Sequence, residues 1–278
     1  MSDLSSAPIG VFDSGFGGLT VARAIADLLP GEDMVYLADT ARGPYGPRPL
    51  AEVREFTLQS LDWLAAQGVK ALVIACNTGS SAALRDARER YPQLPIIEVV
   101  MPAARKAVSV TRDGRVGLIC TAATAISGSY NDALEVSPVE LVTSVCPKFV
   151  PFVEAGVISG DELMAAAEEY LEPLKEQQVD TLVLGCTHYT LLSDVISSII
   201  GDDVALVSSA DECAHATLDT LKREGLLRHD GATPRRRFFT TGDPTRFESL
   251  GRQLMGGFVQ DATQIELGTV AGGSEPTR

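Results

Sequence analysis

The chain has 278 residues, of which 45% are hydrophobic and 22% charged, a composition typical of a globular protein with one large or two modest domains. Its formal net charge of −14 argues against a nucleic-acid partner, because general binding of phosphates draws on an excess of Lys and Arg. The N-terminus lacks the basic and apolar regions of a signal peptide, and no apolar run approaches the roughly 20 residues that span a bilayer, so we expect a cytoplasmic protein without a membrane partner.

Apolar strands alternate with amphipathic helices along the chain. The first part predicts strands over 8–13, 33–39, 69–76 and 94–100, and helices over 19–30, 50–68 and 80–91. The second part predicts strands over 114–121, 140–147, 179–186 and 204–210, and helices over 129–134, 158–178, 191–200 and 211–225. Residues 235–256 predict a last strand and helix, and residues 271–278 are expected to be disordered.

This alternation predicts an α/β fold with parallel sheets covered by helices on both faces. In such sheets, ligands bind beyond the carboxyl ends of the strands. The residues at those ends are therefore the first candidates for a site: Asp13, Asp39, Cys76, Thr121 and Cys186.

Two of these ends belong to an internal similarity. "VKALVIACNT" begins at Val69 and "VDTLVLGCTH" at Val179, and they align on Cys76 and Cys186. The two cysteines are 186 − 76 = 110 residues apart, about the length of one small α/β domain. Two related, pseudo-symmetric halves would place the cysteines on opposite walls of a cleft.

Two facing thiols suit racemisation or epimerisation, in which one group removes a proton from one face of a carbon and the other returns a proton to the opposite face. A free thiol has a pKa of about 8.5, so a neighbouring base is needed. His188 lies two residues after Cys186, and Asp13 ends the first strand, so each could serve one cysteine.

The cysteines also allow other interpretations. Buried free cysteines are common, and a thiol beside an imidazole also suits a nucleophile or half of a zinc site. The five cysteines show no C-x-x-C spacing, and the three histidines include none near Cys76, which disfavours both a disulfide framework and a metal. Cys120 is expected to be a core thiol. No lysine has a context that supports pyridoxal phosphate.

Four motifs carry a resemblance to a known family. In chain order they are "GVFDSGFGGLTV", "YLADTARGPYG", "VIACNT" and "VLGCTHYTLL". Together they closely resemble the motifs of glutamate racemases, in the cofactor-independent aspartate/glutamate racemase family. The resemblance extends from Ile9 to about Gly257, and only single positions depart from the usual pattern: Ala41, Gly79, Cys120 and Thr190.

The resemblance implies an isomerase that interconverts L- and D-glutamate for peptidoglycan synthesis, with no cofactor and no metal. It implies two α/β domains, 1–98 with 210–278 and 99–209, with the site in the cleft between them. It also implies catalytic roles for Cys76 and Cys186, assisted by Asp13, His188 and Glu154. The residues implied to contact glutamate are Asp13, Ser14, Tyr45, Gly46, Asn77, Thr78, Thr187 and His188.

The sequence does not decide three points: the substrate, whether the protein is catalytic, and its oligomeric state. The substrate could be aspartate or another acidic amino acid, because pocket length is not visible in the motifs. The scaffold could also bind an amino acid without catalysis, although the presence of both cysteines argues against this. A homodimer is compatible with the resemblance.

Overall fold

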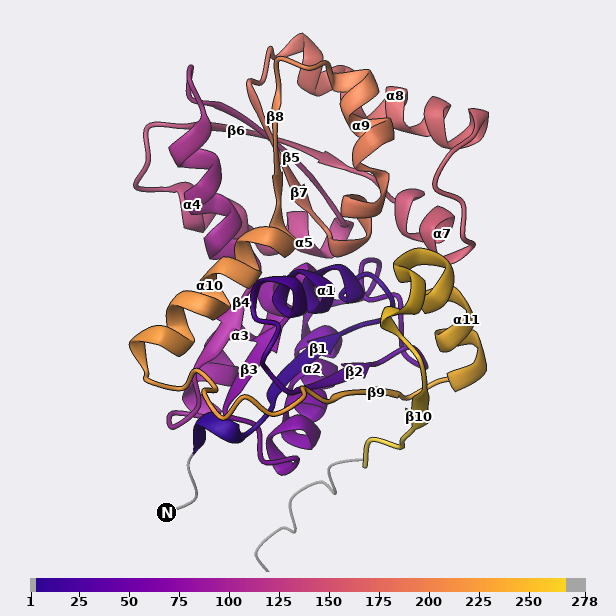
Figure 1. The fold of residues 1–278 in the computed structure, drawn as a ribbon. Helices are drawn as coiled ribbons and strands as arrows, with labels where there is room; N and C mark the ends of the chain where they lie inside the picture. Colours follow the sequence, from indigo (N-terminus) through magenta and orange to yellow (C-terminus); the bar gives the residue numbers. More distant parts are fainter. Residues whose placement is uncertain (1–3, 269–278) are drawn as a thin grey trace, which may run out of the picture.

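A computed structural model describes residues 4–268, so the expectation for 271–278 lies outside the described residues. Two parallel sheets lie one above the other, each covered by helices (Figure 1). The predicted α/β class with parallel sheets is confirmed.

The larger sheet has six strands in the order β10-β9-β2-β1-β3-β4, so the first strand lies near its middle. Every residue of β1, β2 and β3 is buried, as expected for parallel strands covered on both faces. The strands of this sheet are β1 (Ile9–Asp13), β2 (Met34–Ala38), β3 (Ala71–Ile74), β4 (Ile96–Glu98), β9 (Arg236–Thr240) and β10 (Ala262–Gln264).

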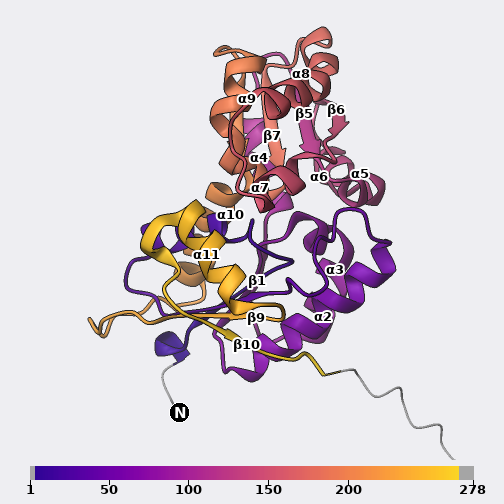
Figure 2. The same cartoon turned by 90° about the vertical axis from the view of Figure 1, so that its right-hand side faces the viewer.

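Successive side chains of β1 point to opposite faces of this sheet. Ile9 and Val11 pack into a core with α1 (Leu19–Leu28), whereas Phe12 packs against α2 (Leu50–Ala66). The first face is also covered by α10 (Ser209–Arg223) and α11 (Pro244–Met255), and the second by α3 (Asn77–Arg90) (Figures 1 and 2).

The smaller sheet has four strands in the order β6-β5-β7-β8. The strands are β5 (Arg115–Cys120), β6 (Glu140–Val145), β7 (Thr181–Gly185) and β8 (Ala205–Ser208). The core on one face includes α4 (Val100–Val110) and α6 (Ser129–Leu134), and the core on the other includes α7 (Phe149–Glu154), α8 (Asp161–Glu176) and α9 (Ser193–Ile200). Each sheet draws its strands from one of the two predicted domain ranges, whose boundaries stay a prediction.

The predicted strand over 94–100 is too long, and the helix that follows was missed. The Glu98 carboxylate accepts hydrogen bonds from the backbone N–H groups of Val100 (2.6 Å) and Met101 (2.9 Å), so it caps α4 and ends the strand. Further elements that the sequence did not predict are α5 (Ala122–Ser127), α7, β10 and the short 3₁₀ helices η1 (Leu4–Ser6), η2 (Thr187–Leu192) and η3 (Gly256–Phe258). Within residues 4–268, the helices are all too short or too polar to cross a membrane.

Candidate active site

Cys76 lies between the end of β3 and the first turn of α3. Its Sγ accepts a hydrogen bond from the Gly79 N–H (3.3 Å) and donates one to Ser14 Oγ (3.4 Å). Burial, and next the negative charge of Asp13, raise the pKa of this thiol to about 12. Cys76 is therefore protonated at neutral pH in the unliganded protein.

Cys186 occupies the equivalent place after β7, where η2 begins. Its Sγ lies 3.7 Å from His188 Nδ1, and His188 Nε2 lies 3.4 Å from Glu154 Oε1. Burial raises the pKa of Cys186 well above its ordinary value, although the backbone N–H of His188 opposes the shift. The imidazole thus lies between the thiol and a carboxylate, although its Nε2 makes no hydrogen bond of standard geometry with residues 4–268.

A glycine turn between β1 and α1 lies between Asp13, the neighbour of Cys76, and His188, the neighbour of Cys186. A Cβ on Gly17 would lie 2.8 Å from His188 Cε1, and a Cβ on Gly18 would lie 2.6 Å from Asp13 Cγ. Only glycine allows these approaches, since real Cβ atoms do not come within 3.0 Å of another heavy atom. The turn therefore packs directly against the Cys186 group on one side and the Asp13 carboxyl on the other.

The Asp13 carboxyl is buried beside this turn. Its Oδ2 accepts a hydrogen bond from the Gly15 N–H (2.8 Å), whereas Oδ1 makes none of standard geometry with any residue from 4 to 268. Burial raises the pKa of Asp13, and the neighbouring His188 is the largest opposing influence. A buried carboxylate oxygen with spare hydrogen-bonding capacity is suited to a substrate N–H or to a proton in transit.

Asn77 and Thr78 follow Cys76 and join the larger sheet to elements of the smaller one. Asn77 accepts a hydrogen bond from the Tyr130 hydroxyl (2.8 Å) and donates one to Ser209 Oγ (3.1 Å). Thr78 Oγ1 lies 3.0 Å from Thr121 Oγ1. Both side chains are thus already oriented by neighbours, and the sequence had not indicated Tyr130 or Ser209.

Gly46 and Thr187 also lie where the two sheets meet. The Gly46 carbonyl accepts a hydrogen bond from the Ala123 N–H of α5 (2.9 Å). The Thr187 carbonyl accepts a longer one from Thr20 Oγ1 of α1 (3.4 Å). Tyr45 behaves differently, because its hydroxyl donates to the buried carboxylate of Asp39.

The predicted residues thus fall into two groups. Asp13, Ser14 and Cys76 are linked to Cys186, His188 and Glu154 through the glycine turn, and Glu154 Oε1 would lie 3.4 Å from a Cβ on Gly15. The Tyr45 hydroxyl already donates its hydrogen bond to Asp39. It could donate to a ligand only if that bond broke.

A cavity of about 230 Å³ lies beside the site, although neither Cys76 nor Cys186 lines it. It is lined by Ser14, Gly15 and Glu154 from the site and, toward its exposed rim, by Thr40 and Arg246. In the part of the chain that the structure describes, no three His, Cys, Asp or Glu side chains are arranged to hold a metal ion.

Comparison with known proteins places this arrangement in a family. The sequence model of the Asp/Glu/Hydantoin racemases matches residues 9–217. The chain belongs to that racemase family. The glutamate racemase of Parafrankia sp. is 56% identical over 255 residues, which cover 91% of this chain and 92% of that protein. The glutamate racemase of Acidothermus cellulolyticus is 54% identical over 94% of this chain and all of that protein.

Solved racemase structures share the whole fold. The glutamate racemase RacE1 from Bacillus anthracis superimposes with a TM-score of 0.90 at 37% identity, over 95% of this chain and 98% of that one. The enzyme from Francisella tularensis, solved in complex with D-glutamate, gives a TM-score of 0.88 at 33% identity over the same shares. The racemase resemblance seen in the four motifs is confirmed over nearly the full length.

Proposed function

We propose that this protein is a glutamate racemase that interconverts L- and D-glutamate by two-base proton transfer. The observation that carries the proposal is the pair of buried thiols, each at the carboxyl end of a central strand of its own sheet and each beside its own titratable neighbour. Relatives that are 52–56% identical over most of the chain are named glutamate racemase.

The reaction needs one cysteine as a thiolate and the other as a thiol. The thiolate takes the α-hydrogen as a proton, and the electron pair of the C–H bond stays on the α-carbon. The opposite thiol then gives its proton to the other face of that carbon. Product release leaves the first cysteine protonated and the second as thiolate, so the roles exchange in the reverse direction.

The neighbours supply the route to the thiolate. His188 Nδ1 can accept the Cys186 proton, and Glu154 next to Nε2 stabilises the imidazolium that forms. On the other side, the raised pKa of Asp13 makes its carboxylate a better acceptor for the Cys76 proton. The ammonium group of a bound amino acid adds positive charge in the same buried region, which lowers the pKa of both thiols.

The substrate carboxylates need donors, and the site supplies them without an excess of basic residues. We propose that the hydroxyls of Ser14, Thr78 and Thr187, the Asn77 amide and backbone N–H groups bind them. The exposed Arg246 at the rim of the cavity adds a positive charge on the route of a dicarboxylate. The D-glutamate produced would serve peptidoglycan synthesis, and a homodimer stays a prediction for sedimentation analysis.

Circular dichroism of L-glutamate and of L-aspartate during incubation with the purified protein tests reaction and substrate together. We expect the L-glutamate signal to decay to zero, because the equilibrium constant of a racemisation is one, and the L-aspartate signal to persist. Decay of the aspartate signal alone would assign the protein to the rival substrate. Binding of glutamate without decay of either signal would favour the non-catalytic alternative.

A further inference from the structure

We propose that Asp39 is a positioning residue. It fixes the loop of residues 40–48, which carries Tyr45 and Gly46, so that the backbone of this loop stays in position to bind the substrate. The part that concerns substrate rests on the proposed function. Asp39 follows β2 at the carboxyl edge of the sheet, and its side chain is fully buried.

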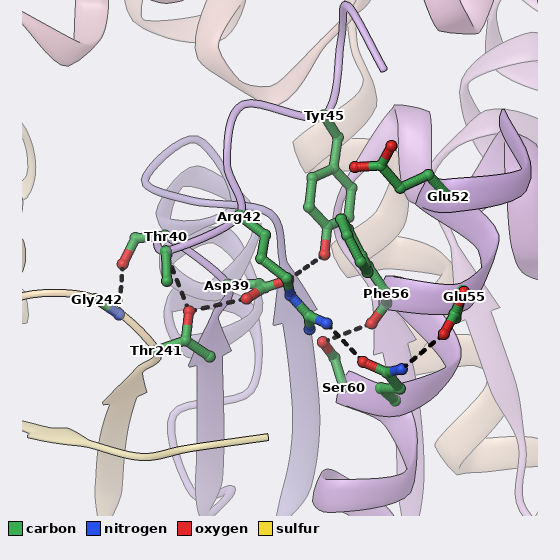
Figure 3. A network of polar contacts seen from close by, with 12 residues as sticks. Asp39, Thr40, Arg42, Tyr45, Glu52, Glu55, Phe56, Ser60, Thr241 and Gly242 are labelled. Carbon is green, nitrogen blue, oxygen red and sulfur yellow. Dashed lines mark hydrogen bonds and ion pairs between the residues drawn. The ribbon is translucent and has the colours of Figure 1, made fainter. Parts of the chain in front are cut away.

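Three side chains donate to the Asp39 carboxylate, as Figure 3 shows. The Tyr45 hydroxyl and Arg42 Nε (2.7 Å) both reach Oδ2, and Thr241 Oγ1 reaches Oδ1 (2.8 Å). A buried carboxylate is stable only when such donors replace its water. Because two of the three donors lie on the loop, the charge can stay buried only while the loop keeps its conformation.

The opposite side of the loop is held by α2. The Arg42 guanidinium lies over the ring of Phe56, 4.2 Å from its centroid, and donates to Gln59 Oε1 (2.5 Å). The Tyr45 ring packs on the same Phe56, with 5.9 Å between the centroids. Burial, and next the Asp39 charge, raise the pKa of Tyr45 well above its ordinary value, so its hydroxyl stays a donor.

The backbone of this loop reaches both parts of the site. The Asp39 N–H donates to the Asp13 carbonyl (2.9 Å), and a Cβ on Gly43 would lie 2.7 Å from the Ser14 carbonyl oxygen. At the far end, the Gly46 carbonyl is bonded to α5, and a Cβ on Gly46 would lie 2.9 Å from Thr121 Cβ. A shift of the loop would therefore move the Ser14 side of the site relative to the smaller sheet.

The resemblance implies that Tyr45 contacts glutamate, and the bond of its hydroxyl to Asp39 limits how the side chain can do so. The Tyr45 hydroxyl donates its hydrogen bond to Asp39, so Tyr45 and Gly46 contribute to substrate binding through their backbone. Removal of either partner of the Tyr45–Asp39 bond should then loosen the same loop. The two substitutions should weaken substrate binding by the same route, and combining them should add little.

The test uses Tyr45→Phe, Asp39→Asn and the double variant of the full chain. We expect each single variant to raise KM for glutamate about tenfold, with kcat within about threefold of wild type. The double variant should match the more impaired single variant, because residues that act as one unit give non-additive effects. Tyr91→Phe is the matched control: it removes a Tyr–Asp bond of the same kind, to Asp62, whose partners Tyr91 and Arg90 lie outside the loop, and should leave KM unchanged.

Hydrogen–deuterium exchange of the amides in residues 40–48 gives a readout that needs no activity. We expect faster exchange in Tyr45→Phe and Asp39→Asn and no change in Tyr91→Phe. If the wild type does not racemise glutamate, the proposed function fails, and exchange in the loop still decides the positioning role. Unchanged loop exchange, unchanged KM, or additive effects in the double variant would overturn the proposal. If Asp39→Asn fails to fold, Tyr45→Phe decides alone.

Discussion

Substitution of Gly17 by alanine should separate catalysis from folding. The added Cβ would lie 2.8 Å from His188 Cε1 and closer still to Nδ1 and to Thr187 Oγ1. Ordinary contacts begin at 3.4 Å, so Cε1 must move by 3.4 − 2.8 = 0.6 Å, and Nδ1, which lies closer to the added Cβ, must move further. The separation of Cys186 Sγ and His188 Nδ1 is already 3.7 Å, close to the limit for a hydrogen bond to sulfur.

Misplacement of a catalytic group by about 1 Å costs about 100-fold in rate, which corresponds to about 2.7 kcal/mol of transition-state stabilisation. We therefore expect Gly17→Ala to lower kcat about 100-fold, measured by circular dichroism from L- and from D-glutamate. The value of kcat/KM must fall equally in both directions, because the equilibrium constant is one. Overpacking should lower the free energy of unfolding by only about 1–3 kcal/mol.

Gly31→Ala is the control, since a Cβ at Gly31 would have no neighbour within 4 Å. It should retain wild-type kcat and stability. A Gly17→Ala protein that keeps its full kcat would refute the argument that His188 must lie against Cys186. A variant that simply fails to fold would be recognised from its circular dichroism before any assay.

Three further predictions concern a core thiol, a hydrogen-bonded carboxylate and the titration of two buried thiols. Cys120→Ser should keep kcat within about threefold of wild type, because Cys120 is a core thiol; a 100-fold loss would instead give it a role in proton transfer. Burial alone would raise the pKa of Asp180, but hydrogen bonds led by Thr111 lower it to about 2, so its stabilisation is present above pH 4 and lost toward pH 2. Asp180→Asn should therefore cost about 2 kcal/mol in urea unfolding at pH 7 and much less near pH 2, whereas an equal cost at both would contradict the assignment. Burial raises the pKa of Cys76 and Cys120 to about 12, so the unfolded chain loses these protons first as pH rises above 9. The free energy of unfolding should then fall by up to about 1.4 kcal/mol per pH unit for each thiol between pH 9 and 12, and flat stability over that range would contradict the burial.

The equivalent positions of Cys76 and Cys186 could be predicted from sequence, because a similar apolar strand precedes each cysteine, and each cysteine follows a strand of its own sheet. The boundary between strand β4 and helix α4 could not be predicted from sequence. Val99 and Val100 continue the apolar pattern of the strand, and only the Glu98 carboxylate, bonded to the next backbone N–H groups, marks the change.

The contacts that orient the site residues could not be predicted from sequence, for a different reason. Asp39 receives its third hydrogen bond from Thr241, about 200 residues later in the chain, and Asn77 is held by Tyr130 and Ser209. Such partners are set by the packing of the two sheets and carry no local pattern. The strand-end position of Asp39 was visible, but its partners were not.

The α-hydrogen of glutamate in deuterium oxide tests the two-base mechanism most directly. L-Glutamate is incubated with the wild-type protein to low conversion, and both enantiomers are separated and analysed by mass spectrometry. Two opposed thiols predict that the D-glutamate formed carries deuterium at the α-carbon, while the remaining L-glutamate keeps its original hydrogen. D-Glutamate that retains the original hydrogen would contradict the transfer of protons between Cys76, Cys186 and the two faces of the substrate.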